Sequence, residues 1–216
     1  MPNPVNNLVS IRKDLKSKIK NHQELKIIAV SKTFEIDRIL PLIKYGHLDY
    51  GENKVQEALN KWTNVKPTYP KIKLHLIGKL QTNKVKFAIK LFDYIHSVDN
   101  EKLAKKIAEE EQKINKKVKI FIQVNIGEED QKAGVNKNNL DDLYSYCKGL
   151  NLDIVGLMCI PPFNINPTSY FKELEFLKDK YKLNELSMGM SSDYIEAAKY
   201  SSTFLRIGSG IFGQRN

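Results

Sequence analysis

Residues 26–33, KIIAVSKT, join an apolar run to a lysine and a threonine, and a helical pattern follows at residues 35–45. A short continuous apolar run is typical of a strand buried on both faces, as in a parallel sheet. The stretch therefore predicts a buried strand followed by a helix, with Lys32 at the carboxyl end of the strand.

The same strand and helix unit recurs along the chain. Strands are predicted at residues 26–32, 48–52, 73–78, 94–98, 119–125, 153–160, 185–188 and 204–208. Helices are predicted at residues 6–21, 35–45, 54–61, 82–91, 101–115, 140–148, 167–181 and 191–200. Eight strands alternating with helices favour a closed (β/α)8 TIM barrel over an open doubly wound sheet, in which six or so strands are usual.

No linker rich in Pro, Gly or Ser interrupts this alternation, so one domain is expected over residues 1–216. The segment 1–23 is expected to contribute an extra helix outside the barrel. It has no apolar signal sequence, and no uncharged run is long enough for a membrane span. We therefore expect a cytoplasmic protein with no membrane partner.

The net charge of +10 raises the question of nucleic-acid binding. The basic residues are scattered and mixed with Asp and Glu, and no nucleic-acid-binding motif accompanies them, so solvated helix faces explain the charge better. Cys147 and Cys159 lack the spacing of a zinc site or a disulfide framework.

The four histidines, His22, His47, His75 and His96, fall on separate predicted elements, which argues against a metal site. His75 alternates with two leucines within its strand, so its side chain is expected to point into the barrel. It would be a core residue or, alternatively, a cofactor contact. Glu52 ends the second strand and is either a general base or a loop anchor.

In a TIM barrel, chemistry gathers at the carboxyl ends of the strands, because the loops there form one rim. Lys32 lies on that rim. Burial would lower the pKa of its amine and free it to attack an aldehyde and form a Schiff base. The alternative is a strand-end lysine whose amine simply reaches solvent.

Two further segments on the rim predict anion binding. In residues 187–193, SMGMSSD, a strand passes through a glycine to a serine that would cap the next helix. Residues 206–213, RIGSGIFG, contain three glycines that would allow the backbone to approach a ligand closely. Each segment alone could be an ordinary structural turn. Together with Lys32, they provide the minimum needed to hold pyridoxal 5′-phosphate (PLP).

Motifs along the chain are similar to those of the pyridoxal phosphate homeostasis protein family. They are AVSKT at 29–33, GEN at 51–53, HLIG at 75–78, LQTNK at 80–84, QVNI at 123–126, GLM at 156–158, LSMGMS at 186–191 and RIGS at 206–209. The resemblance covers essentially the whole chain. Two departures are Lys79, where the family usually has Pro, and Leu74, where it often has Trp or Tyr.

This resemblance implies a TIM barrel of PLP fold type III, similar to the N-terminal domain of alanine racemase, that binds PLP as a Schiff base on Lys32. Ser191 and the backbone around Gly208 and Ser209 would hold the phosphate. Arg206 would face the pyridine nitrogen, and Asn53 and Met188 would line the ring pocket.

A guanidinium beside the pyridine nitrogen disfavours its protonation and weakens the cofactor as an electron sink. The resemblance thus implies a PLP carrier without substantial turnover and with no catalytic residue. Apo forms of PLP-dependent enzymes are possible recipients. The alternative is a PLP-dependent amino-acid racemase, but the second domain that supplies the racemase tyrosine is not expected in a chain that ends soon after Ser209. That domain also carries the main racemase dimer contact, so a monomer is expected.

Overall fold

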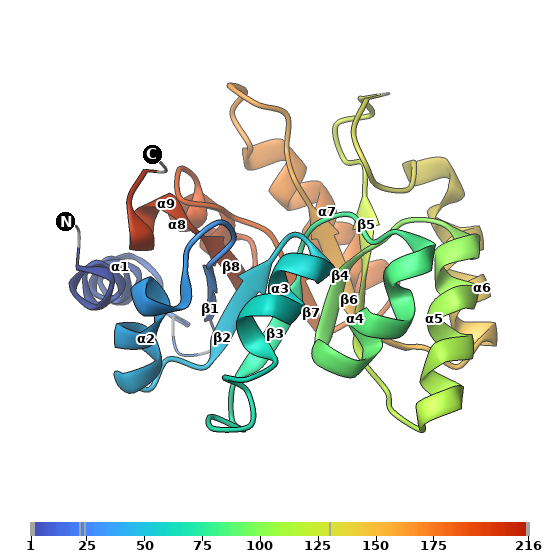
Figure 1. Ribbon diagram of the computed structural model, residues 1–216. Helices are drawn as coiled ribbons and strands as arrows, with labels where there is room; N and C mark the ends of the chain where they lie inside the picture. Colours follow the sequence, from blue (N-terminus) through green and yellow to red (C-terminus); the bar gives the residue numbers. More distant parts are fainter. Residues whose placement is uncertain (1–2, 22, 24, 130, 215–216) are drawn as a thin grey trace.

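A computed structural model describes residues 3–21, 23, 25–129 and 131–214. His22, and with it part of the segment 1–23, lies outside the described residues. Within the described part of the chain, eight parallel strands close a barrel in the order β1 to β8, and β8 pairs with β1. The expected (β/α)8 barrel is confirmed, and Figure 1 shows the helices arranged around the strands.

The strands and helices alternate as the sequence predicts. The strands are β1 (Lys26–Val30), β2 (Asp49–Glu52), β3 (Lys73–Leu76), β4 (Tyr94–Val98), β5 (Lys119–Val124), β6 (Asp153–Cys159), β7 (Glu185–Ser187) and β8 (Phe204–Ile207). The helices are α1 (Pro4–Lys18), α2 (Ile36–Lys44), α3 (Val55–Trp62), α4 (Val85–Leu91), α5 (Glu101–Ile114), α6 (Leu140–Gly149), α7 (Thr168–Lys180), α8 (Tyr194–Lys199) and α9 (Ser209–Phe212), with 3-10 turns η2 (Thr82–Lys84) and η3 (Lys137–Asn139).

The first helix begins earlier than the predicted residue 6. The side chain of Asn3 accepts hydrogen bonds from the backbone N–H groups of Val5 and Asn6, and Pro4 occupies the first turn, where its missing N–H costs nothing. The buried residues of α1 are Pro4, Leu8, Ile11 and Leu15. The helix lies outside the barrel against α2, α8 and α9, and in Figure 1 both chain ends lie on this side of the molecule.

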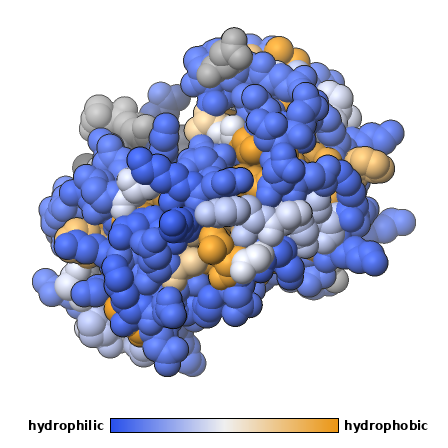
Figure 2. All heavy atoms as spheres, turned by 90° about the vertical axis from the view of Figure 1, so that its right-hand side faces the viewer, coloured by the Kyte–Doolittle hydropathy of each residue, from blue (hydrophilic) through white to orange (hydrophobic). Residues whose placement is uncertain are grey.

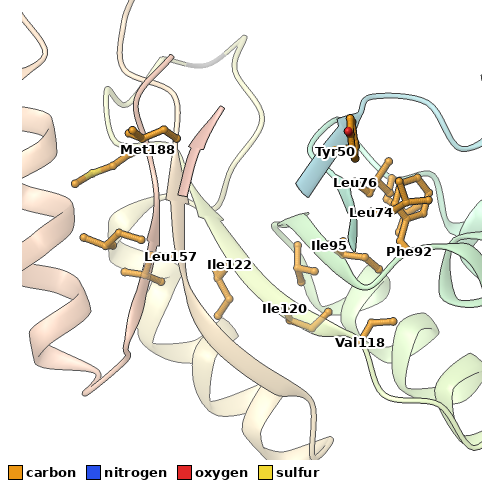
Figure 3. Packing of buried hydrophobic residues seen from close by; sticks show 14 of the residues in the cluster. Tyr50, Leu74, Leu76, Phe92, Ile95, Val118, Ile120, Ile122, Leu157 and Met188 are labelled. Atoms are coloured by element: carbon orange, nitrogen blue, oxygen red, sulfur yellow. The ribbon is translucent and has the colours of Figure 1, made fainter. Parts of the chain in front are cut away.

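Apolar side chains form two separate clusters, because alternate residues of a strand point to opposite faces. The outer cluster fills the space between the barrel and its helices, and part of it, including Leu157 and Met188, is shown in Figure 3. The inner cluster fills the barrel and contains Ile28, Val30, Phe121, Met158 and Phe204.

The surface is largely hydrophilic, as expected for a chain with 28% charged residues, and Figure 2 shows apolar side chains only in small groups on the face it presents. Among the described residues, no helix is both long and apolar enough to cross a membrane.

Candidate functional site

The predicted site residues lie at the carboxyl ends of the strands, on one rim of the barrel. Lys32 follows β1 by two residues, Asn53 follows β2 and Met188 follows β7. Arg206 lies within β8, and Gly208 and Ser209 follow that strand. Gly208 packs against the end of β1, since a Cβ built on it would lie 3.4 Å from Val30 Cβ. The closed barrel thus brings the first and last predicted segments together.

Lys32 is half-buried and belongs to a turn rather than to the predicted strand, which ends at Val30. The next residue, Thr33, has a φ of 69°, in the left-handed region that a β-branched residue rarely adopts. Side chains from outside the turn hold it in this conformation. Ser31 Oγ donates to Glu52 Oε1 at 2.7 Å, and the backbone N–H of Thr33 donates to Glu57 Oε1.

These contacts belong to a clamp formed by Glu52, Glu57 and Lys61. The Lys61 ammonium donates to the backbone oxygen of Ser31 at 2.8 Å and to Glu52 Oε1 at 2.9 Å, and it also pairs with Glu57. Trp62 Nε1 donates to the same Glu52 oxygen at 3.0 Å. Glu52 is fully buried, so the structure favours the anchor over the general base. Sequence reasoning missed Lys61, although its i,i+4 spacing from Glu57 was a usable signal.

Ser191 does not cap the helix that follows it, α8, contrary to the prediction. Asp193 Oδ1 accepts the backbone N–H of Met190 at 2.5 Å, and the turn it closes delays the start of α8 to Tyr194. Ser191 Oγ instead accepts the backbone N–H of Gly210 at 3.1 Å. The two glycine-containing segments predicted to bind an anion therefore meet and form one cradle.

Gly210 in this cradle has little room for a side chain. A Cβ there would lie 3.0 Å from Ile207 Cγ2 and 3.5 Å from Ser191 Oγ, so a side chain would crowd the cradle. Ser209 and Gly210 are exposed and Ser191 is half-buried, which leaves the cradle open to an anion from solvent. A serine hydroxyl, glycine backbone and the start of a helix suit a phosphate chemically.

Arg206 is buried, and its guanidinium lies at the level where β6 and β7 end. Nη1 donates to Ser187 Oγ at 2.7 Å, and Nη2 donates to the backbone oxygen of Cys159 at 2.8 Å. Burial lowers the pKa of Arg206 from its usual value, and Cys159 and Asp193 oppose the effect. Its backbone N–H donates to Gly189 O at 2.9 Å, which ties β8 to the turn after β7.

The two predicted ring-pocket residues differ in their surroundings. Asn53 is half-buried, and Gly78 approaches it so closely that a Cβ on Gly78 would lie 2.4 Å from Asn53 O. Met188 is fully buried, and its side chain packs in the outer cluster, because Ser187 before it points into the barrel. Any contact that Met188 makes at the rim is therefore made by its main chain.

A row of polar side chains inside the barrel was not anticipated. His75 is a buried core residue, and its Nε2 lies 3.0 Å from Asp49 Oδ1. Its Nδ1 lies 3.0 Å from His96 Nε2, and His96 Nδ1 lies 2.9 Å from Ser187 Oγ. We call Asp49, His75, His96, Ser187 and Arg206 the interior chain. His75 and His96 lie on the separate elements β3 and β4, as predicted, but the pairing of these two strands makes the histidines neighbours.

Comparison with known proteins places this geometry in a family. Residues 7–216 match the family model described as the alanine racemase N-terminal domain. The pyridoxal phosphate homeostasis protein of Aquifex aeolicus is 39% identical over 200 residues, which are 88% of this chain and 87% of the relative. The chain belongs to the pyridoxal phosphate homeostasis protein family. The resemblance inferred from the motifs is thus confirmed.

Solved structures agree with this assignment. PipY of Synechococcus elongatus, solved with PLP bound, is 31% identical with a TM-score of 0.86, and the match covers 98% of this chain and all of PipY. An alanine racemase of Clostridium difficile shares the fold at 15% identity and a TM-score of 0.76, over 99% of this chain and 57% of the racemase. The shared fold therefore extends over most of this chain and a little over half of the racemase chain.

Proposed function

We propose that this chain binds PLP and acts in PLP homeostasis, with Lys32 as the covalent anchor. The observation that carries the proposal is the rim itself. It gathers Lys32, the Ser191 and Gly210 cradle and Arg206 in a barrel that is similar over its whole length to PipY, a structure solved with PLP bound. When bound, PLP supplies an aldehyde and an electron-accepting ring.

The Lys32 amine would attack the aldehyde carbon, forming a C=N bond, and the aldehyde oxygen would leave as water. The clamp supports this role, because it holds the turn through its backbone and through Ser31. Glu52 and Glu57 are thereby occupied by Ser31, Thr33 and Lys61. The predicted roles of Ser191, Gly208 and Ser209 toward the phosphate, and of Asn53 and Met188 toward the ring, are part of the same proposal.

Arg206 supports a carrier rather than an enzyme. Its guanidinium carries a permanent charge, and a charge of this kind beside the pyridine nitrogen would keep that nitrogen unprotonated. An unprotonated ring withdraws electrons weakly, so amino-acid chemistry would be slow. We propose that the protein holds PLP, as a monomer, and passes it to apo forms of PLP-dependent enzymes.

The anchor is tested by adding PLP to the purified chain, reducing with borohydride and locating the modified lysine by peptide mass spectrometry. Lys32 should carry the adduct, and Lys32→Ala should abolish the Schiff-base absorbance band. Lys79→Ala is the control, since Lys79 is an exposed lysine that follows β3 on the same rim. An unchanged band in Lys32→Ala would overturn the assignment.

The carrier role is tested by incubating the loaded protein with alanine in deuterated water. We expect exchange of the α-hydrogen no faster than with free PLP. Rapid exchange would instead favour the racemase alternative.

A further inference from the structure

The interior chain runs through the barrel from one end to the other. Asp49 is the first residue of β2 and lies at the end opposite the rim, whereas Ser187 is the last residue of β7. Each intermediate group bonds one neighbour toward Asp49 and one toward Arg206, with contacts of 2.7 to 3.0 Å. The five side chains therefore form one continuous hydrogen-bonded path from a carboxylate to a guanidinium.

With both histidine rings neutral, the chemistry at the two ends determines the direction of every hydrogen bond. The Asp49 carboxylate can only accept, so His75 donates from Nε2 and must accept at Nδ1 from His96 Nε2. From the other end, Arg206 can only donate, so Ser187 Oγ accepts from it, and the Ser187 hydroxyl donates to His96 Nδ1, which carries no proton in this tautomer. Both ends lead to the same arrangement, in which every donor points toward Asp49.

This arrangement requires both histidines to be neutral, because a second ring proton would leave two donors facing each other. Burial lowers the pKa of both His75 and His96, and each is fully enclosed. Aromatic rings exclude water from the histidines of the interior chain. Tyr94 stacks on His75 with centroids 4.3 Å apart, and Phe121 stacks on His96 at 4.2 Å.

We propose that His75, His96 and Ser187 are positioning residues for Arg206: they fix the direction of its guanidinium at the rim and connect it through hydrogen bonds to the carboxylate of Asp49 at the far end of the barrel. This inference rests on the proposed binding of PLP. A carboxylate directly beside Arg206 would offset its field and compete for its donors. A neutral serine and two neutral histidines orient the guanidinium and leave its charge directed at the rim.

The test uses the full chain loaded with PLP that carries 15N at the ring nitrogen. Ser187→Ala removes one hydroxyl and interrupts the hydrogen bonds of the interior chain next to Arg206. We expect the 15N signal to move from its wild-type position and the Kd for PLP to rise about tenfold, the cost of losing one hydrogen bond to a charged group.

The matched control is Ser97→Ala. Ser97 is also a buried strand serine, it directly follows His96, and no described group bonds its hydroxyl. For Ser97→Ala, the 15N signal of bound PLP and the Kd for PLP should equal those of the wild type. A second variant, Asp49→Asn, keeps an acceptor for His75 but removes the distant charge. It should move the signal in the same direction by a smaller amount, and it decides the test if Ser187→Ala does not fold.

Three outcomes are distinguishable. If the wild type shows no Schiff-base band, the proposed function fails. If the wild type binds PLP but folded Ser187→Ala and Asp49→Asn both keep its 15N signal and its Kd, the positioning role is overturned. If Ser187→Ala moves the signal and Asp49→Asn leaves it unchanged, Arg206 is held locally, and the role assigned to the histidines and Asp49 is wrong.

Discussion

Lys32 and Arg206 lie on the same rim, but different parts of the two residues are fixed. We call their surroundings the lysine side and the arginine side. On the lysine side, three charged residues of the clamp grip the turn that carries Lys32, largely through its backbone. On the arginine side, Arg206 is held through its own guanidinium, and its nearest side-chain partner in the interior chain is the neutral Ser187. The charged groups bond each other directly in the clamp, whereas neutral side chains separate Arg206 from Asp49 within the interior chain.

This difference matches the different roles proposed for the two residues. A residue that must form and break a covalent bond needs a well-fixed backbone. A residue that acts as a fixed charge needs a fixed side chain whose field is not cancelled nearby. The comparison can be tested by disturbing each side separately.

The largest effect is expected on the lysine side. Glu52→Gln removes the fully buried charge of an ion pair whose other member, Lys61, is 7% exposed. Breaking a buried pair in this way should lower the free energy of unfolding by about 4 kcal/mol, measured by urea denaturation. The control is Asp141→Asn, which breaks the exposed pair with Lys180 and should leave the urea midpoint unchanged. A similarly small change in the free energy of unfolding of both variants would contradict the claim that the ion pair of the clamp is buried.

Acid should act through the buried histidines, which are absent from the clamp. Burial lowers the pKa of His47 to about 4, and it also lowers the pKa values of His75 and His96. The unfolded chain therefore binds more protons below pH 6.5, so stability falls as pH drops from 6.5 toward 4. His47 alone accounts for about 3 kcal/mol of this loss.

Urea midpoints between pH 7 and pH 4 measure this loss. His47→Gln should show a shallower decline, because two of the three buried histidines remain. Hydrogen exchange at pH 5 should show faster opening of β3 and β4 than of the turn at residues 31–33. Stability that does not change with pH over this range would show that these histidines are not buried and neutral.

The smallest effect is expected for Thr33→Gly. Glycine relieves the left-handed strain at Thr33 but gives the unfolded chain more freedom, and the two effects oppose each other. The free energy of unfolding should change by less than about 1 kcal/mol. A gain well above that value, in the same urea assay, would mean that the clamp stores strain at the lysine side.

Sequence reasoning reached the barrel and its rim because both follow from local patterns. Apolar runs such as 26–30 identify buried strands, and alternation with helices gives a parallel barrel, which puts Lys32 and Arg206 on one rim. The prediction from sequence was wrong at the start of α8, where several side chains could accept the backbone hydrogen bonds of the turn. The start of α8 after Asp193 rather than at Ser191 accompanies a turn in which the Asp193 carboxylate accepts the N–H of Met190.

His96 shows a second reason for failure. The pairing of β4 with β5 shifts register between Ile95 and Val98, and such an irregularity leaves no mark in the hydrophobic pattern. Its partners His75 and Ser187 are 21 and 91 positions away in the chain.

The sequence by itself determined the order of the elements, the family and the residues available at the rim, because these depend on hydrophobic period, turn residues and motif spacing. Only the tertiary structure decided how those residues are held. The clamp joins the turn after β1 to β2 and α3, and the interior chain joins β4 to β7 across the closed barrel, so both depend on contacts between elements that only the tertiary structure brings together.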